Sequence, residues 1–415
     1  MRSMQMHMHS ATELEVDEVL PARRSLRVAV VSETYPPEVN GVAATISRVV
    51  DGLHHRGHQL QLLRPRQDKG EAALQEERFA EVLMRGLPIP RYPQLKMGLP
   101  SRRALQKLWS LKRPDVVHLV TEGPLGWSAL QAASHLKLPV VSDFRTNFHA
   151  YSKHYGVAWL RNPIMAYLRK FHNRTACTMV PTEGLRAELQ ATGFKGVRVV
   201  SRGVDTRLFD PARRSPALRQ RWGAGPADMV VMCVGRLAAE KNLGTLLQAF
   251  ESLQSVDRSA RLVLVGDGPE RTSLQQRCPA AIFAGLRRGE DLAAHYASAD
   301  LFLFPSVTET FGNVLPEAMA SGLAVVGFDY AAAHQLVQHG DNGLLVPFDN
   351  NEAFRATVQR LGGQIAWVRA MGAQARHTAC RLDWGHIVEQ VESVYAAAIA
   401  QPLLLGRAVW LPALR

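Results

Sequence analysis

The chain has 415 residues, which is enough for two domains that each bury their own hydrophobic core. Its 47% apolar and 21% charged residues are typical of globular proteins, and no apolar run reaches the ~20 residues of a membrane-spanning helix. The formal net charge of +12 leaves three kinds of partner open: a nucleic acid, an anionic membrane surface or an anionic small molecule.

The amino-terminal segment MRSMQMHMHSATELEVDEVL has no apolar core bounded by a cleavage site. We therefore interpret residues 1–26 as a disordered tail and not as a secretory signal, and we expect a cytoplasmic protein. The cysteines are scattered without CxxC spacing. We expect neither disulfides nor a structural zinc from Cys177, Cys233, Cys278 and Cys380.

Short apolar runs alternate with helical patterns over residues 27–205. The run LRVAVVSE, for example, precedes a helical pattern whose apolar residues recur at i, i+3, i+4 and i+7, at Ile46, Val49, Val50 and Leu53. Strands rich in Val and Leu and separated by helices predict a parallel sheet with helices on both faces, and so a first doubly wound domain.

A second series of the same kind covers residues 227–385. We interpret the preceding segment 206–226, rich in proline and arginine, as a linker, and residues 386–415 as a helix returning to the first domain and a tail. The sequence thus predicts an α/β fold of two doubly wound, Rossmann-like domains facing across a crevice. Because ligands of such sheets bind beyond the carboxyl ends of the strands, we expect the active site in this crevice.

The positive charge is concentrated in one stretch of the first domain, residues 85–113. No acidic residue lies between Glu81 and Asp115, whereas eight cationic residues do: Arg85, Arg91, Lys96, Arg102, Arg103, Lys107, Lys112 and Arg113. The stretch is either a solvated basic face or a surface for an anionic partner. No RNP, helix-turn-helix or zinc-finger pattern accompanies it, so we expect no nucleic acid.

The segment VGRLAAEKN, residues 234–242, passes from a strand into a helix. Arg236 lies at the strand end and Lys241 near the helix start, where two cations and unpaired amide groups favour a diphosphate. The alternative is that Glu240 and Lys241 are merely solvated. The chain lacks the GxxxxGK[ST] of a P-loop, and VGDGPE lacks the third glycine of GxGxxG, so a nicotinamide cofactor has little support.

The segment ETFGNVLPEAMASG, residues 309–322, also connects a strand to a helix. Pro316 suits the first helical turn, the amide groups before it are expected to be unpaired, and Gly312 allows a ligand to approach the main chain. The preference of acidic residues for first helical turns is enough to explain Glu317. It does not explain Glu309.

These segments together resemble the retaining glycosyltransferases of the GT-B fold, family four, also called group 1. The resemblance rests on E-x7-E from Glu309 to Glu317 and on ETYPPEVNGVA, DVVHLVTEGPLG, SRGVDTRLFDP, VGRLAAEKN and VGDGPE in the expected order. It covers about residues 27–390. The pattern of ETYPPEVNGVA, VTEGPLG and SDFRTNFHAYSKHYG is most similar to the branch of GDP-mannose-dependent alpha-mannosyltransferases, which lies close to enzymes that glycosylate diacylglycerol.

The resemblance implies a role for each matching residue. Arg236 and Lys241 would hold the donor diphosphate, Glu317 would bind the ribose hydroxyls, and Glu309 would bind hydroxyls of the transferred sugar. Further donor contacts would come from the backbone of Gly41, from Gly285 and Leu286 at the base, and from the amides of Phe311, Gly312, Asn313, Val314 and Leu315. No DxD motif is needed, so we expect no metal and no cofactor besides the nucleotide-sugar donor.

One motif departs from the family pattern. Many relatives carry HxHEP where this chain reads DVVHLVTEGPLG, so the second histidine has no counterpart. Glu122 and His149 are candidates to replace it near the acceptor; the alternative is that they are loop and core residues. We interpret His118 as a strand histidine with a structural partner.

The resemblance implies a retaining transfer of a hexose, preferably mannose from GDP-mannose and otherwise a sugar from a UDP-hexose, to a glycolipid or diacylglycerol-type acceptor. A lipid acceptor would explain the basic stretch 85–113 as a peripheral contact with the anionic inner face of the membrane. A nucleotide-sugar epimerase or a phosphorylase on the same scaffold is an alternative, since fold alone does not decide function. A non-catalytic nucleic-acid binder is a third hypothesis.

Overall fold

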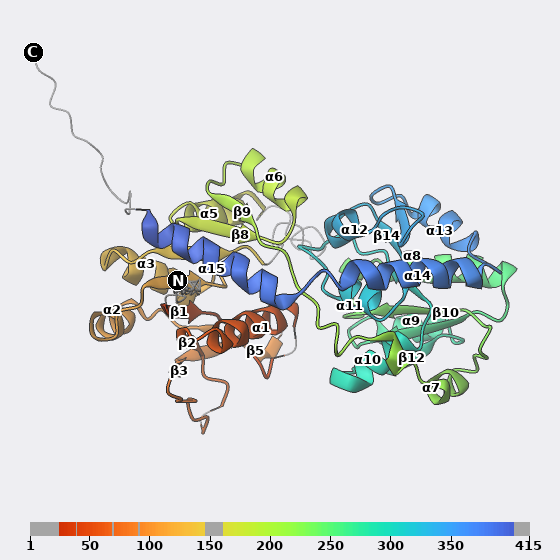
Figure 1. The fold of residues 1–415 in the computed structure, drawn as a ribbon, viewed down its shortest axis with the longest axis horizontal. Coiled ribbons are helices and arrows are strands. Elements are labelled where there is room, and N and C mark those ends of the chain that lie inside the picture. Colours follow the sequence, from red (N-terminus) through yellow and green to blue (C-terminus); the bar gives the residue numbers. More distant parts are fainter. Residues whose placement is uncertain (1–24, 39, 69, 90–91, 146–160, 402–415) are drawn as a thin grey trace, which may run out of the picture.

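The computed structural model describes residues 25–38, 40–68, 70–89, 92–145 and 161–401. They form two lobes that lie side by side, each built around one parallel sheet (Figure 1). In these residues no helix is both long enough and apolar enough to cross a membrane.

The first lobe contains a sheet of seven described strands in the order β3-β2-β1-β6-β7-β8-β9, and every neighbouring pair is parallel. The strands are β1 (Arg27–Val31), β2 (Gln59–Pro65), β3 (Phe79–Met84), β6 (Val116–Leu119), β7 (Val140–Asp143), β8 (Cys177–Val180) and β9 (Val197–Val199). The described helices of this lobe are α1 (Gly41–His55), α2 (Arg102–Leu111), α3 (Pro124–His135), α5 (Arg161–His172) and α6 (Glu183–Ala191). Two more strands of this lobe, β4 (Gly86–Ile89) and β5 (Tyr92–Gly98), form a separate antiparallel sheet.

The second lobe contains a parallel sheet of six described strands in the order β12-β11-β10-β13-β14-β15. Numbered along the chain this order is 3-2-1-4-5-6, the order of a dinucleotide-binding doubly wound fold. The strands are β10 (Val230–Val234), β11 (Arg261–Val265), β12 (Ile282–Gly285), β13 (Leu301–Phe304), β14 (Ala324–Phe328) and β15 (Gly343–Val346). The helices that accompany them are α7 (Pro216–Arg221), α8 (Leu243–Val256), α9 (Arg271–Arg277), α10 (Gly289–Ala297), α11 (Val314–Ala320), α12 (Ala331–Leu336), α13 (Asn351–Gln359) and α14 (Ile365–Ala379).

The apolar patterns of the sequence reappear as buried faces. The stripe of α1 predicted from its spacing is buried at all four positions, Ile46, Val49, Val50 and Leu53. Strand β13 is buried along its whole length, because helices cover both faces of a parallel sheet. The prediction of two doubly wound domains is confirmed.

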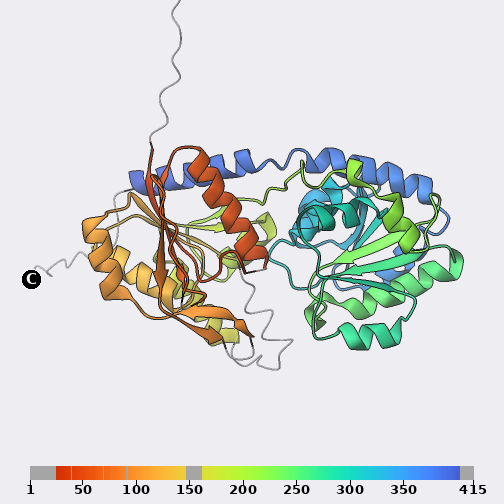
Figure 2. The same cartoon turned by 90° about the horizontal axis from the view of Figure 1, so that it is seen from below.

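The segment 206–226 is more than a connection. Its side chains Phe209, Leu218 and Trp222 are buried in the core of the second lobe, and it forms α7. In the other direction, helix α15 (Trp384–Ala400) returns to the first lobe and packs against α1 so closely that a Cβ on Gly52 would lie 2.5 Å from Val388. Figure 2 shows α14 and α15 in succession along one side of both lobes.

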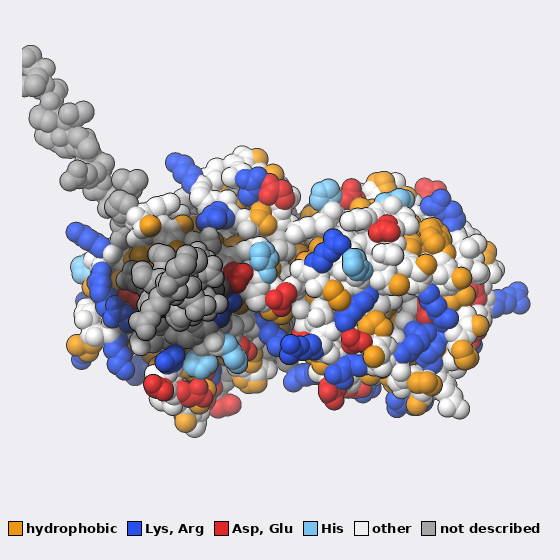
Figure 3. Space-filling view, in the orientation of Figure 1, with side chains coloured by type: hydrophobic (Ala, Val, Ile, Leu, Met, Phe, Trp, Pro, Cys, Tyr) orange, Lys and Arg blue, Asp and Glu red, His pale blue; other side chains and the backbone are white. Residues whose placement is uncertain are grey.

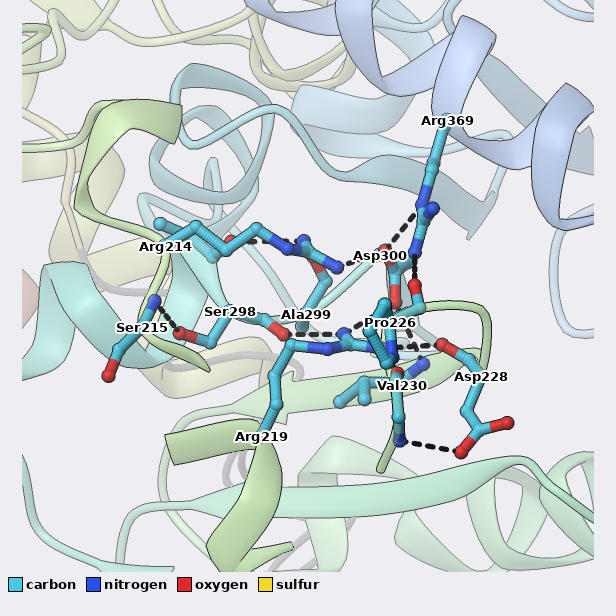
Figure 4. A network of polar contacts seen from close by, with 12 residues as sticks. Arg214, Ser215, Arg219, Pro226, Asp228, Val230, Ser298, Ala299, Asp300 and Arg369 are labelled. Carbon is cyan, nitrogen blue, oxygen red and sulfur yellow. Dashed lines mark hydrogen bonds and ion pairs between the residues drawn. The ribbon is translucent and has the colours of Figure 1, made fainter. Parts of the chain in front are cut away.

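The amino edge of the second sheet is held by a carboxylate surrounded by arginines (Figure 4). Asp300, just before β13, accepts hydrogen bonds from Arg214 at 2.8 Å, Arg219 at 2.9 Å and Arg369 at 3.1 Å, and from the amide of Val230 at 3.0 Å. Each guanidinium group also donates to backbone carbonyls within residues 225–228 or 297–299. These bonds tie α7 and α14 to the sheet.

A cavity of about 930 Å³ adjoins this cluster. It lies at the amino ends of the strands, opposite to the edge at which doubly wound sheets bind ligands. Its lining residues include Arg214, Arg219, Asp300 and Arg369.

Candidate active site

The predicted site residues follow the strands at which the order of each sheet reverses. In the second sheet the order reverses between β10 and β13, and the chain leaving these strands contains Arg236, Lys241 and Glu309. In the first sheet it reverses between β1 and β6, and the chain leaving them leads to Gly41 and Glu122. Such reversal points open a crevice at the carboxyl edge, which is where nucleotides bind doubly wound sheets.

Lys241 and Glu309 form an ion pair in the second lobe. Lys241 ends a short 3-10 turn, Ala239–Lys241, and Glu309 lies five residues after β13; its carboxylate also accepts from the Ser306 hydroxyl at 2.8 Å. The hydroxyl of Tyr330 donates to the Glu309 carbonyl at 2.8 Å and so fixes the backbone there. Two predicted residues that are 68 positions apart are thus in direct contact.

Arg236 forms an ion pair with Glu240 across the same turn. Glu240 is only 1% exposed, and its second carboxylate oxygen has no hydrogen-bond partner in the described part of the chain. The alternative of a solvated Glu240 and Lys241 is therefore wrong: the turn is built around a buried carboxylate that holds Arg236 at the strand end.

The loop between Glu309 and α11 presents several amide groups. Within the described residues, the amides of Phe311, Gly312, Asn313 and Val314 make no backbone hydrogen bond. The amide of Leu315 differs from the expectation, since it donates to the Gly312 carbonyl at 3.0 Å in the turn that opens the helix. Leu315 is therefore not available as a donor-binding amide.

Gly312 is required by the packing of this loop. Its φ of +98° is unfavourable for other residues, and a Cβ there would lie 2.5 Å from the ring of Phe304. The sequence suggested a different reason for this glycine, the close approach of a ligand.

Glu317 lies in the first turn of α11, next to a buried tyrosine. Tyr296 donates its hydroxyl hydrogen bond to the Glu317 carboxylate at 3.0 Å. Desolvation of the carboxylate outweighs this bond and raises the pKa of Glu317 to about 7. The group therefore titrates near neutral pH.

Polar contacts join the carboxyl edges of the two sheets. Asn313 donates to the Thr45 hydroxyl at 3.0 Å and to the carbonyl of Gly41, the first residue of α1, at 3.3 Å. Thr310 donates to the carbonyl of Arg145 at 3.2 Å. Figure 3 shows the narrow waist at which the two lobes meet.

Gly285 and Leu286 lie together at the carboxyl end of β12. Gly285 has a φ of +73°, and Leu286 is 55% exposed, which is unusual for a large apolar side chain next to a sheet. An exposed leucine at this edge offers an apolar surface on which a base can lie. The role in base binding stays a prediction.

Glu122 is buried in the first lobe and accepts from His172 at 3.3 Å. It lies near Glu33, which accepts from the amide of Leu125 at 2.8 Å. Burial raises the pKa of Glu33 to about 7, and the nearby Glu122 adds to this rise, whereas backbone hydrogen bonds from Leu125, Gly98 and Gly126 oppose it. Glu33 was not predicted as a site residue, although it is the first residue of the motif ETYPPEVNGVA. His149 lies outside the described residues.

His118 has the structural partners expected of it. Its ring nitrogens contact the Tyr395 hydroxyl at 2.8 Å and the Asp143 carboxylate at 2.9 Å, all three groups being buried. Asp143 also accepts from Arg145 at 2.6 Å. Burial alone would raise the pKa of Asp143, but Arg145 and His118 outweigh it and hold the pKa well below its usual range.

Metal ligands do not gather in the described part of the chain: no three His, Cys, Asp or Glu side chains are placed to hold an ion there. The four cysteines are all unbridged.

Comparison with known proteins identifies the family. Residues 39–208 match the model of "Glycosyltransferase Family 4", and residues 228–363 match that of "Glycosyl transferases group 1". The GDP-mannose-dependent alpha-mannosyltransferase of Mycolicibacterium smegmatis is 35% identical over 91% of this chain and 98% of its own length. The chain belongs to the group 1, family 4 glycosyltransferases.

Two further likenesses are more distant. The alpha-monoglucosyldiacylglycerol synthase of Acholeplasma laidlawii is 25% identical over 79% of this chain and 86% of its own length. The structure of sucrose-phosphate synthase from Thermosynechococcus elongatus matches with a TM-score of 0.74 at 19% identity, covering 91% of this chain and all of that one. The fold is therefore of the GT-B type.

Proposed function

We propose that the chain is a retaining, metal-independent hexosyltransferase that moves mannose from GDP-mannose to a hydroxyl of a glycolipid or diacylglycerol-type lipid. The observation that carries this proposal is the ion pair of Lys241 with Glu309 at the reversal point of the second sheet, in a chain similar to GDP-mannose-dependent enzymes. The alternative donor is a UDP-hexose, because a glucosyl-transferring relative is also similar.

In the proposed reaction the bond between the anomeric carbon and the diphosphate breaks, and the acceptor oxygen bonds to that carbon on the same face. The departing phosphate takes the proton of the acceptor hydroxyl. Arg236 and Lys241 stabilise the negative charge of the leaving group, a role that a metal ion has in other enzymes. Glu309 orients the sugar while holding the Lys241 ammonium group at the diphosphate.

The acceptor side of the proposal rests on the basic stretch 85–113. Helix α2 presents Arg102, Arg103 and Lys107 to solvent, whereas Leu105 and Trp109 are buried against the lobe. Figure 3 shows several basic side chains on the side of the lobe where Figure 1 places α2. A surface of this kind attracts an anionic leaflet.

A donor screen tests the proposed function. Nucleotide release and sugar transfer to extracted lipid are measured with GDP-mannose, UDP-glucose and UDP-galactose, for the wild type and for Glu309→Ala. We expect transfer from GDP-mannose and a loss of about 100-fold or more in Glu309→Ala, the size found when one group that stabilises a transition state is removed. The exposed Glu352→Ala serves as the matched control. Full transfer by Glu309→Ala would disprove the assigned role, and interconversion of donor sugars without acceptor would indicate an epimerase.

A further inference from the structure

Arg202 is a buried guanidinium group that has no bonded partner among the described residues. The side chain lies three residues beyond the end of β9 and is 7% exposed, yet it makes no hydrogen bond and no ion pair within the described part of the chain. Burying a charge without a counter-charge is costly, so native proteins pair such groups with an anion from the chain or from a ligand.

The surroundings of Arg202 contain more positive than negative charge. Arg145 and Asp143 are the charged groups that act on it, and Asp143 is already bonded to Arg145 and to His118. One guanidinium nitrogen of Arg145, Nη1, is also buried without a hydrogen-bond partner among the described residues. Burial, together with repulsion from Arg145, lowers the pKa of Arg202 to about 9. The two arginines therefore share one carboxylate and keep unused N–H donors.

This pair lies where the two lobes meet. The carbonyl of Arg145 accepts from Thr310, which follows the sugar-binding candidate Glu309 directly in the chain. The hydroxyl of Ser201, the neighbour of Arg202, accepts from Gln335 of α12 in the second lobe at 3.2 Å. The unused donors thus belong to the acceptor-side lobe, at its contact with the donor-binding loop.

We propose that Arg145 and Arg202 form a subsite for a phosphate group of the acceptor, which narrows the proposed acceptor to a lipid that carries a phosphate. The inference rests on the proposed function, because it assigns the acceptor to the first lobe. A phosphate ester offers oxygens to both guanidinium groups and balances their excess charge, and arginine binds phosphate in a bidentate way. The donor diphosphate is the other possible source of such oxygens, but Arg236 and Lys241 of the second lobe are already assigned to it.

Calorimetric titration of the full chain tests the subsite. Glycerol 1-phosphate, with glycerol as the neutral control, is titrated in phosphate-free buffer into protein saturated with GDP. We expect binding of glycerol 1-phosphate only, weakened about ten- to a hundred-fold in Arg202→Gln, as for loss of one charge-assisted bidentate contact. Arg202→Lys should recover part of the affinity, and the exposed Arg207→Gln should match the wild type.

Two further readouts separate the explanations. GDP affinity should be unchanged in Arg202→Gln; a drop there, with unchanged phosphate binding, would assign Arg202 to the donor and overturn the subsite. Thermal stability of Arg202→Gln should equal or exceed that of the wild type, because the change removes an unpaired buried charge. Lower stability with unchanged phosphate affinity would show a purely structural role. If wild-type protein binds neither GDP nor UDP, the proposed function fails; if it binds nucleotide but no glycerol 1-phosphate, only the subsite fails.

Discussion

Two buried aspartates, Asp300 and Asp143, each gather arginines, but the two clusters are organised differently. Around Asp300 every guanidinium group also donates to backbone carbonyls, and the cluster lies at the amino edge of its sheet. Around Asp143 the cluster lies at the carboxyl edge, and Arg202 bonds to nothing in the described chain. Arginines that donate mainly to backbone carbonyls, as around Asp300, where Nε of Arg219 is the one buried nitrogen that lacks a partner among the described residues, hold a fold together. An arginine that bonds to no group of the described chain at a ligand edge is suited to bind an anion.

The strongest test of this contrast is Asp300→Asn. The change leaves the 5%-exposed Arg219 side chain facing a neutral group, and breaking a buried ion pair in this way costs about 3–5 kcal/mol of unfolding free energy. Denaturant unfolding of the full chain measures the loss. Arg369→Gln, which removes a partly exposed partner of the same carboxylate, should cost less than about 1 kcal/mol. Equal losses in the two variants would mean that burial does not set the strength of this cluster.

The same cluster has a pH signature. Burial would raise the pKa of Asp300, but Arg214, the Val230 amide and Arg219 outweigh it and lower the pKa below its ordinary value of 3.8. The unfolded chain therefore binds the proton more readily than the folded chain. The stability that Asp300 contributes is present above pH 3.8 and is lost as the pH falls through the lower, folded pKa.

A second test addresses the carboxyl edge of the second sheet, where we expect the charged side chains to affect the reaction more than the stability of the fold. Lys241→Met should lower kcat/KM for the donor by about 100- to 1,000-fold, the usual effect of removing one group that stabilises a developing negative charge. Lys241→Arg keeps the charge next to Glu309 and should retain more activity. Steady-state kinetics with the preferred donor, beside a thermal melt of each variant, distinguishes lost catalysis from lost folding. A Lys241→Met enzyme with wild-type kinetics would remove Lys241 from the diphosphate site.

The sequence predicted the strands correctly wherever both faces of the strand are buried. Runs such as residues 230–234 and 301–304 are apolar throughout because helices cover both faces, and both were predicted as strands. The strands within residues 79–98 were not predicted. Strand β3 lies at the edge of its sheet and contains Glu81, and β4 and β5 contain prolines, so none of the three has a clear apolar pattern.

Site residues could be predicted from the sequence only where they lie together in one short motif. Glu309 and Glu317 share one motif, so they could be named as a pair. Asp143 and Arg202 are 59 positions apart, and only the strand order β7-β8-β9 brings their strands to the same side of the sheet. The sequence does not show that order, so Arg202 was noted only as part of the motif SRGVDTRLFDP and was not predicted as a site residue.

A third test uses the titration of Glu317 in the proposed donor site. Because its folded pKa of about 7 lies above the ordinary 4.5, protonation stabilises the folded chain, and stability falls as the pH rises from 4.5 to about 7. If the ionised carboxylate accepts from the ribose hydroxyls, GDP-mannose affinity should rise about tenfold from about pH 6 to about pH 8. Equilibrium binding without acceptor measures this, and Glu317→Gln should give a flat profile. A wild-type profile that is already flat would place Glu317 away from the ribose.

The smallest expected effect concerns the exposed arginines and lysines of α2, which belong neither to the Asp300 cluster nor to the carboxyl edges of the sheets. Lys107→Gln should weaken binding to anionic vesicles about fivefold, since one surface cation contributes about 1 kcal/mol at such a membrane. Leu111, 77% exposed at the end of the same helix, offers an apolar contact beside these charges. Co-sedimentation with phosphatidylglycerol vesicles at low salt measures the affinity, with the exposed Arg355→Gln of the second lobe as control. A similar loss in both variants would mean that net charge alone attracts the protein, and no sedimentation of the wild type would exclude the α2 surface as a membrane contact.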